Sequence, residues 1–358
     1  MVNNAIIADI ENRDIGKVVR EAFEQLDIMK LIKQSRELFV HVPLGATLFN
    51  EGTPIGGTYL DVDLAEAIIR AGEGKLVTFY EAPATVHENI KHLFEIMGYT
   101  QLAEKYSQVR LLSLADDNDL KTRKLPVDYG FDYPPLEFPK FLFDKENLII
   151  SFSNPKAPFS EKVAGFNGLP FSLSGKALIM GSALFRKKNL IHLAFHDIGL
   201  GLKDFVIDGL GQIRKAGVTC IGINGGRFAG GMIDQVKVHP VDWNVLVISS
   251  NIGIADAVTA SLMGFNPQEL VYFAYLAEKG YIPSDLRNIS VIEIGNGRNR
   301  LEEQLIEKND FLLQGAPITT RQWVFGLLNQ VSFKDRLRMA GKMIPAMIKY
   351  KISKKRKS

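Results

Sequence analysis

The sequence predicts an α/β fold of two lobes, each a mostly parallel sheet flanked by helices. Short apolar runs alternate with amphipathic helical patterns over residues 21–115, and the alternation resumes near residue 147. The intervening sequence is rich in charge, aromatic residues and proline and lacks this rhythm. We therefore predict a first lobe at residues 1–118, a connecting segment at 119–145, a second lobe at 146–316 and a helical basic tail at 317–358.

Three strands and three helices are expected in the first lobe. The helical patterns cover residues 21–35, 62–71 and 87–97; Asp61 is placed to cap the second, and Gly98 to end the third. The apolar runs ELFVHVPL, KLVTFYEA and VRLLSLA predict strands at 37–44, 75–82 and 109–115.

The second lobe continues the same alternation. Strands are expected at residues 147–152, 218–223 and 245–248, and a helical region with two interrupting glycines at 190–215. Residues 176–184 suit either a strand or a buried helix. The last strand ends in a polar turn, after which Gly253 and Asp256 lie where a helix begins. Such strand-to-helix crossings expose backbone amides beside a carboxylate, although an ordinary helical Asp explains the pattern too.

Composition excludes several classes of protein. The chain has 358 residues, 46% hydrophobic and 23% charged, as expected of a globular α/β protein. The single cysteine, Cys220, excludes a disulfide framework and an iron–sulfur cluster held by this chain alone; no other cofactor is indicated. No stretch approaches the roughly 18 apolar residues of a spanning helix. We expect a cytoplasmic protein without a secretion signal or transmembrane segment.

The charge is concentrated at the C-terminus. Residues 332–358 hold ten of the 43 basic residues and one of the 40 acidic residues, so this tail carries +9 and the remainder −6. Its apolar positions form one stripe between the basic ones, which suits an anionic membrane surface or a partner protein, with Pro345 interrupting the helix. An inert, solubilising tail is the alternative. We expect no sequence-specific binding of nucleic acid.

One histidine pair has the spacing of helical metal ligands. His192 and His196 are four residues apart in LIHLAFHDIG, so a helix would carry both imidazoles on one face, and Asp197 follows. The glutamate of the zinc hydrolase motif is missing between them. Metal binding, acid or base catalysis and ordinary packing all remain open for this pair, and no particular metal is indicated.

A glycine-rich segment follows the strand expected at 218–223. The sequence GINGGRFAGG includes Asn224 and Arg227, and glycine amides approach an anion closely while arginine offers a forked donor. The segment matches neither the phosphate loop nor a dinucleotide-binding loop, and the sequence after it looks extended. Anion recognition and a purely structural role are both open.

Five further residues are candidates by position. His41 and Glu81 lie near the ends of expected strands, where a sheet presents a cleft, and Lys156 and Asn251 follow two others. Asp256 completes this set. For each of them a structural role, as scaffold or solvated surface, is the competing explanation.

Four blocks of the chain resemble the bacterial and archaeal domain of unknown function 362. They are GKVVREAFEQL, FVHVPLGATLFNEG, IKHLFEIMGYTQLAEKY with the following VRLLSLADD, and IADAVTASLMGFNPQEL, in the family's order over residues 16–295. The last block closely resembles the family's "VAVDAVAARLMGF-P-E" helix. A cleft between two lobes, as expected here, would resemble in architecture only the lactate racemase type of two-lobed protein.

This chain also departs from the family's pattern. Val42 stands before Pro43 where the family has lysine, and NPKAP keeps Lys156 but lacks the family's histidine. Lys176 is followed by alanine, Asn251 and Ile252 replace an Asp-Pro pair, and the single cysteine cannot supply a ferredoxin-like extension.

Two functions follow as hypotheses. In the first, the protein is an enzyme that binds a small anionic substrate, a carboxylate or phosphate, between its lobes. Lys156 and Arg227 would hold the anion, Asn224 and Asn251 would orient it with Asp256, and His192 or His196 would move a proton. In the second, the protein is a noncatalytic binding or assembly protein that its basic tail docks to a membrane surface or a partner.

Overall fold

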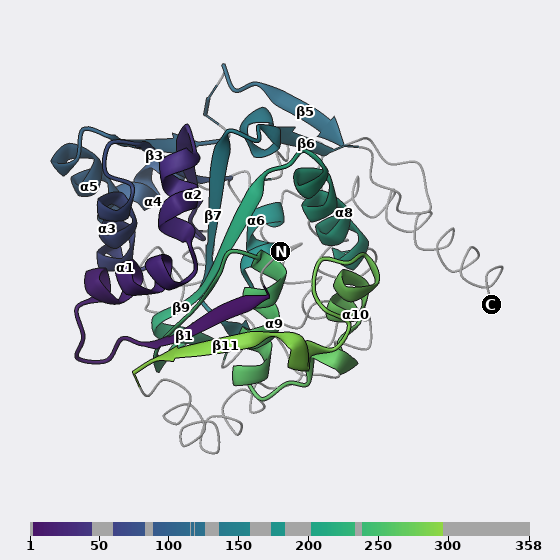
Figure 1. Cartoon of the computed structure of the whole chain (residues 1–358). Helices are drawn as coiled ribbons and strands as arrows, with labels where there is room; N and C mark the ends of the chain where they lie inside the picture. The colour runs from purple at the N-terminus through teal and green to yellow at the C-terminus, as the bar shows by residue number, and fades with distance from the viewer. Residues whose placement is uncertain are drawn as a thin grey trace, which may run out of the picture.

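The computed structural model describes residues 3–44, 60–82, 89–114, 116–117, 119–125, 136–157, 173–182, 202–232 and 238–295. These residues form three layers, a central sheet between two layers of helices (Figure 1). The mostly parallel α/β class predicted from the sequence is confirmed. The predicted tail at 317–358 and the His192/His196 pair lie outside the described residues.

Within the described residues the central sheet has nine strands. Eight follow the order β11-β1-β10-β9-β7-β2-β3-β4, and β8 pairs with the far part of β9. Only the β1–β10 and β9–β10 pairs are antiparallel. The strands are β1 (Asn4–Asp9), β2 (Glu37–His41), β3 (Leu76–Glu81), β4 (Val109–Ser113), β7 (Asn147–Ser153), β8 (Lys156–Ala157), β9 (Thr219–Met232), β10 (Val238–Ser249) and β11 (Ser290–Ile294).

Strands from both predicted lobes belong to this one sheet. β2, from the first lobe, pairs in parallel with β7, from the second, and His41 is in register with Ser151. The two expected lobes therefore do not form separate sheets in the described structure. The sequence did not indicate β1, whose Ile6 is in register with Ile248 of β10 and Ile292 of β11. Apolar runs predict strands but carry no information on which strands pair, so the sequence did not show that strands of both segments would share one sheet.

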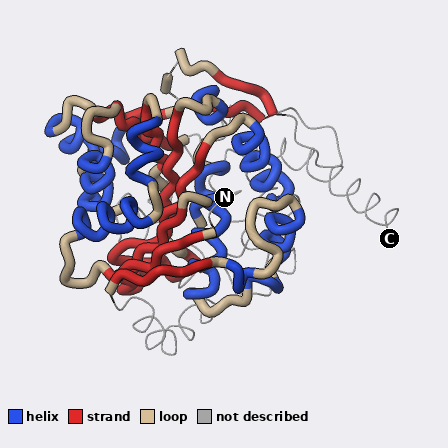
Figure 2. The backbone as a smooth tube through the Cα atoms, in the orientation of Figure 1, coloured by secondary structure: helices blue, strands red, loops and turns tan. Residues whose placement is uncertain are grey.

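Each face of the sheet is covered by its own set of helices (Figure 2). One buried core joins Val40, Phe79 and Ile150 of the sheet to the helices α1 (Ile15–Gln25), α2 (Ile28–Gln34), α3 (Val62–Ala71), α4 (Ile90–Ile96) and α5 (Tyr99–Lys105). The other core joins Phe39, Ile149 and Val247 to the helices α6 (Ser174–Met180), α8 (Leu202–Lys215), α9 (Ile252–Leu262) and α10 (Val271–Glu278).

Most predicted elements are present with small shifts of their ends. The helix expected at 62–71 has these bounds as α3, whereas the region 21–35 is divided into α1 and α2 at Asp27, which has a positive φ of 56°. Residues 174–180 are helical. The sequence after the glycine-rich segment is extended, as expected, because β9 and β10 form a long hairpin.

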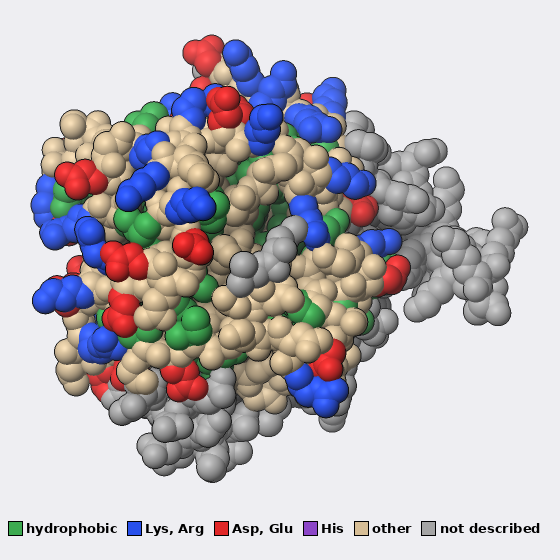
Figure 3. Space-filling model, viewed as in Figure 1, with side chains coloured by type: hydrophobic (Ala, Val, Ile, Leu, Met, Phe, Trp, Pro, Cys, Tyr) green, Lys and Arg blue, Asp and Glu red, His purple; other side chains and the backbone are tan. Residues whose placement is uncertain are grey.

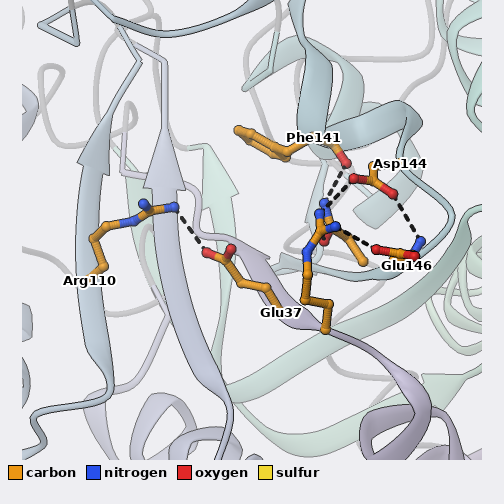
Figure 4. Close-up of polar contacts among 7 residues, drawn as sticks. Glu37, Arg110, Phe141, Asp144 and Glu146 are labelled. Atoms are coloured by element: carbon orange, nitrogen blue, oxygen red, sulfur yellow. Dashed lines mark hydrogen bonds and ion pairs between the residues drawn. The ribbon is translucent and has the colours of Figure 1, made fainter.

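The predicted connecting segment contains structure of its own. Strands β5 (Thr122–Leu125) and β6 (Leu136–Pro139) form a two-stranded antiparallel sheet, followed by a 3-10 helix at Lys140–Phe143. Arg36, just before β2, donates to Asp144 (2.6 Å) and Glu146, and Arg110 of β4 pairs with Glu37 of β2 (2.9 Å; Figure 4). The Arg36–Asp144 contact ties the end of the segment to the start of β2, and the Arg110–Glu37 pair joins β4 to β2.

The direction in which the chain winds reverses between β2 and β7. From β2 the chain moves outward to β3 and β4 through helices on one face, whereas from β7 it moves to β9 through helices on the other. In open α/β sheets, ligands bind in the crevice at the carboxyl ends of the strands that flank such a reversal. The topology therefore directs attention to the ends of β2 and β7.

Candidate functional site

A buried histidine and a buried glutamate meet beside the reversal point. His41 ends β2 and is 1% exposed, and Glu81 ends the neighbouring β3 and is 5% exposed. His41 Nε2 lies 3.4 Å from Glu81 Oε1. The Glu81 carboxylate also accepts the N–H groups of Leu44 (3.1 Å) and Ala82 (2.9 Å). These backbone bonds fix the carboxylate against the imidazole.

The other imidazole nitrogen faces β7. Ser151 Oγ lies 3.4 Å from His41 Nδ1 and donates its own hydrogen to the carbonyl of Ser174 (2.8 Å). Because that hydroxyl hydrogen is already used, Nδ1 is the group that donates to Ser151. On the other side of the ring, Nε2 faces the Glu81 carboxylate.

Helix α6 closes the site over the imidazole. A Cβ added to Gly181, the residue after α6, would lie 1.9 Å from His41 Nε2 and 2.5 Å from Glu81 Oε1. The backbone does not require glycine at this position, since a φ of −77° suits any residue. Glycine is required because His41 and Glu81 approach too closely for a Cβ atom. His41 Nε2 has no hydrogen bond that meets ordinary geometry among the described residues. His41 Nε2 is therefore a buried polar atom whose hydrogen-bonding capacity is unused.

Asp256 is the centre of a second polar cluster beneath α6. Its carboxylate is fully buried and accepts hydrogen bonds from Ser174 Oγ (2.6 Å), Gly175 N (3.0 Å), Asn224 Nδ2 (3.0 Å) and Tyr272 Oη (3.3 Å). Burial raises the pKa of this carboxyl group, and the hydrogen bonds oppose that rise. Burial and the Asp256 charge raise the pKa of Tyr272 well above its usual value.

These contacts give Asp256 and Asn224 a positioning role. Asn224 Oδ1 accepts the Ser174 N–H (2.9 Å), so the two side chains together satisfy the first amides of α6. Since Ser174 also accepts the hydroxyl of Ser151, a continuous polar chain runs from Glu81 through His41 to Asp256. The sequence had singled out four members of this chain separately. It had missed the two serines, which carry no distinguishing pattern.

The other predicted site residues do not join this cluster. Arg227 is exposed and pairs with Asp63 of α3, and its N–H donates to Asp61 (3.1 Å) in place of the expected helix cap. Asn251 caps α9 through Gly253 N (3.1 Å) and donates to the carbonyl of Tyr281 (2.8 Å). Lys156 pairs with Gly230 as part of β8. Their predicted roles in binding an anion stay predictions.

The glycine-rich segment belongs to strand β9. A Cβ on Gly225, whose φ is 115°, would lie 2.0 Å from the carbonyl oxygen of Val245. The pairing of β9 with β10 is irregular here, between Asp242 and Val245. The glycines therefore serve the close approach of two strands, which favours the structural explanation of the motif over a phosphate loop.

A cavity of about 560 Å³ lies at the opposite, amino-terminal edge of the parallel strands. It is lined by the start of β9, by the turn into α9 and by residues of α2 and α8. The residues of the polar chain described above, Glu81, His41, Ser151, Ser174 and Asp256, do not line it. It is thus distinct from the candidate site at the carboxyl ends.

Two searches of the described residues were negative. They contain no group of three or more His, Cys, Asp or Glu side chains arranged to hold a metal ion. Nor does any helix in the described ranges have the length and apolar character needed to cross a bilayer.

Comparison of the chain with family models, with curated proteins and with solved structures found no match. The resemblance to the domain of unknown function 362 therefore stays a prediction, and function has to be argued from the site.

Proposed function

We propose that this protein is an enzyme that transfers a proton to or from a small anionic substrate at the carboxyl ends of β2 and β7. The observation that carries the proposal is the buried His41–Glu81 pair beside the reversal of the sheet. Histidine is the side chain best suited to proton transfer near neutral pH, and a buried carboxylate orients the ring and stabilises its protonated form. The anionic class of substrate comes from the sequence.

The surrounding bonds support this role for His41. Glu81 is held by two backbone N–H groups, and Ser151 by the Ser174 carbonyl, so neither side of the ring has freedom to rearrange. Asp256 and Asn224 hold the start of α6, whose far end packs on the ring at Gly181. In this proposal they are positioning residues. Fixed geometry of this kind is what proton transfer requires.

The test detects proton transfer to or from a carbon atom of the substrate, whatever the overall reaction is. A panel of small carboxylates and phosphates is screened for thermal stabilisation of the full chain, and a ligand at 100 times its Kd should add about 2.7 kcal/mol. Each ligand that binds is then incubated with the protein in D₂O, and the loss of C–H signals is followed by NMR. We expect exchange with the native protein and at least a hundredfold slower exchange with His41→Gln.

The matched control is His92→Gln. His92 is an exposed histidine of α4, paired with Glu95 at 3.6 Å, so its replacement should leave exchange unchanged. Circular dichroism and thermal unfolding establish that both variants fold. Equal exchange in native protein and His41→Gln would refute the role of His41. Slow exchange in a variant of His192 or His196 alone would instead support the helical pair predicted from the sequence.

The noncatalytic hypothesis rests on the basic tail alone. Removing residues 317–358 and measuring binding to anionic vesicles tests it: a docking protein loses binding, and an enzyme keeps exchange activity.

A further inference from the structure

We infer that the cavity at the amino-terminal edge is a second ligand site, for a small amphipathic carboxylate with an aliphatic body. This inference goes beyond the proposed function, because the cavity lies away from His41 and Glu81 and shares no lining residue with them. It rests on the size of the cavity, the character of its walls and the charges at its rim.

The size separates this cavity from a packing defect. Interiors are packed densely, and voids larger than a water molecule are few. A volume of about 560 Å³ lies within the range of small-molecule sites, about 300 to 1,000 Å³. Figure 3 shows a recess with hydrophobic side chains near the centre of this face, with Lys and Arg side chains on both sides.

The exposed wall surface is more apolar than polar, and its residues come from both helical layers. α2 and α8 stand on opposite sides of the strands (Figure 1), so the cavity opens between the two layers rather than within one. No aromatic ring faces it except that of Tyr281 among its lining residues. Walls of this kind suit an alkyl chain. The aliphatic lining residues are Leu26, Leu31, Leu210, Val218, Ile252 and Leu276.

The rim carries two cations and one acid. Lys30 of α2 is exposed and forms no ion pair within the described part of the chain. Arg214 of α8 is held by the carbonyl of Gly280 (2.7 Å) and by the ring of Tyr281 (4.8 Å to its centroid), which positions its guanidinium at the rim. Asp27 is the opposing acid, so the charge of these three residues is +1 and favours an anionic head group.

The polar residues at the start of α9 do not supply the specificity. Asn251, which also lines the cavity, uses its side chain for Gly253 and Tyr281. In this inference Lys30 and Arg214, rather than Asn251, bind the anionic head group. The site should therefore discriminate between ligands by the length of the alkyl chain and by the charge of the head group.

Isothermal titration calorimetry with hexanoate, octanoate and decanoate tests the aliphatic walls. Each added methylene should tighten binding about fourfold, since burying one contributes about 0.8 kcal/mol. Decanol, the neutral counterpart, should bind at least fivefold more weakly than decanoate. Lys30→Glu should weaken decanoate about fivefold, whereas Lys17→Glu, the same change on an exposed residue of α1 outside the cavity, should change it less than twofold.

Cys220 provides a test of where the ligand binds. It is the only cysteine of the sequence, and it lines the cavity. Burial raises the pKa of its thiol to about 12, so modification by methyl methanethiosulfonate is slow, and bound decanoate should slow it at least threefold further. Leu31→Trp should narrow the cavity and weaken the binding of decanoate. Because Leu31 is only partly buried, the variant should still fold.

Several outcomes would overturn the inference. Absence of binding at millimolar decanoate would remove the site, and equal binding of decanol would remove its preference for a carboxylate. Binding that neither protects Cys220 nor responds to Lys30→Glu would place the ligand elsewhere. His41→Gln should leave decanoate binding unchanged, so failure of this inference and failure of the proposed function are distinguishable.

Discussion

Replacement of Asp256 by asparagine should destabilise the protein more than any change of a surface acid. The native carboxylate receives four donors, from Ser174, Gly175, Asn224 and Tyr272, and is fully buried. Asparagine keeps one acceptor oxygen but places an NH₂ group against two of these donors, whichever way the amide is turned.

The magnitude follows from the lost bonds. A hydrogen bond to a charged group contributes about 1.5–3 kcal/mol, and Asp256→Asn loses up to two, because the hydroxyls of Ser174 and Tyr272 can also accept. Removal of a buried charge offsets part of this loss, because burial alone disfavours the ionised carboxyl and raises its pKa. We expect a net decrease of about 3 kcal/mol in the free energy of unfolding. Asp256→Ala, which leaves four donors without an acceptor, should cost about 5 kcal/mol.

Urea unfolding followed by circular dichroism measures both variants. Asp116→Asn, the same change at an exposed position, should stay within about 0.5 kcal/mol of the native protein. A double-mutant cycle with Ser174→Ala should show a coupling energy of about 1 kcal/mol or more, since the two side chains bond at 2.6 Å. A loss below about 0.5 kcal/mol for Asp256→Asn would refute the positioning role.

Three further predictions concern other parts of the fold. Gly181→Ala should cost about 1–3 kcal/mol and displace His41, because its Cβ would overlap Nε2; Gly74→Ala, at φ 78° with open space around it, should lose only about 1 kcal/mol and leave the histidine NMR signals unchanged. Gly225→Ala should cost about 3 kcal/mol or more, read as a lower urea midpoint, because a backbone carbonyl occupies the space of the new methyl group. Bonds from Tyr106, Arg70 and Lys105 lower the pKa of Glu66 from 4.5 to about 2, so its stabilising contribution is present above pH 4.5 and is lost as the pH falls toward 2. Glu66→Gln should therefore lose about 1 kcal/mol at about pH 7, and a difference that stayed constant down to about pH 3 would contradict this assignment.

Local patterns predicted the elements of this protein well. The helix at residues 62–71 and the strands that became β2, β3, β4 and β7 follow from the spacing of apolar residues, which depends only on neighbours in the chain. The strand β1 was missed. Its run of apolar residues is short, and its place in the sheet depends on Ile248 and Ile292, far away in the sequence.

The candidate site was predicted as scattered residues rather than as a cluster. His41 and Glu81 were recognised because the ends of strands are visible in the sequence, but the pair arises only because β2 and β3 are neighbours. Arg227 was an equally good candidate by sequence, yet it pairs with Asp63, an acid of a helix 164 positions away.

The sequence by itself determined the α/β class and the order of most helices and strands, because hydrophobic periodicity is a property of short segments. Only the tertiary structure decided that one sheet joins both halves of the chain and that the direction of winding reverses between β2 and β7. It also decided which polar residues meet: Asp256 bonds to Gly175, which is 81 positions away, and to Asn224, which is 32 positions away. Such contacts depend on how buried faces fit together in three dimensions, and no local pattern carries that information.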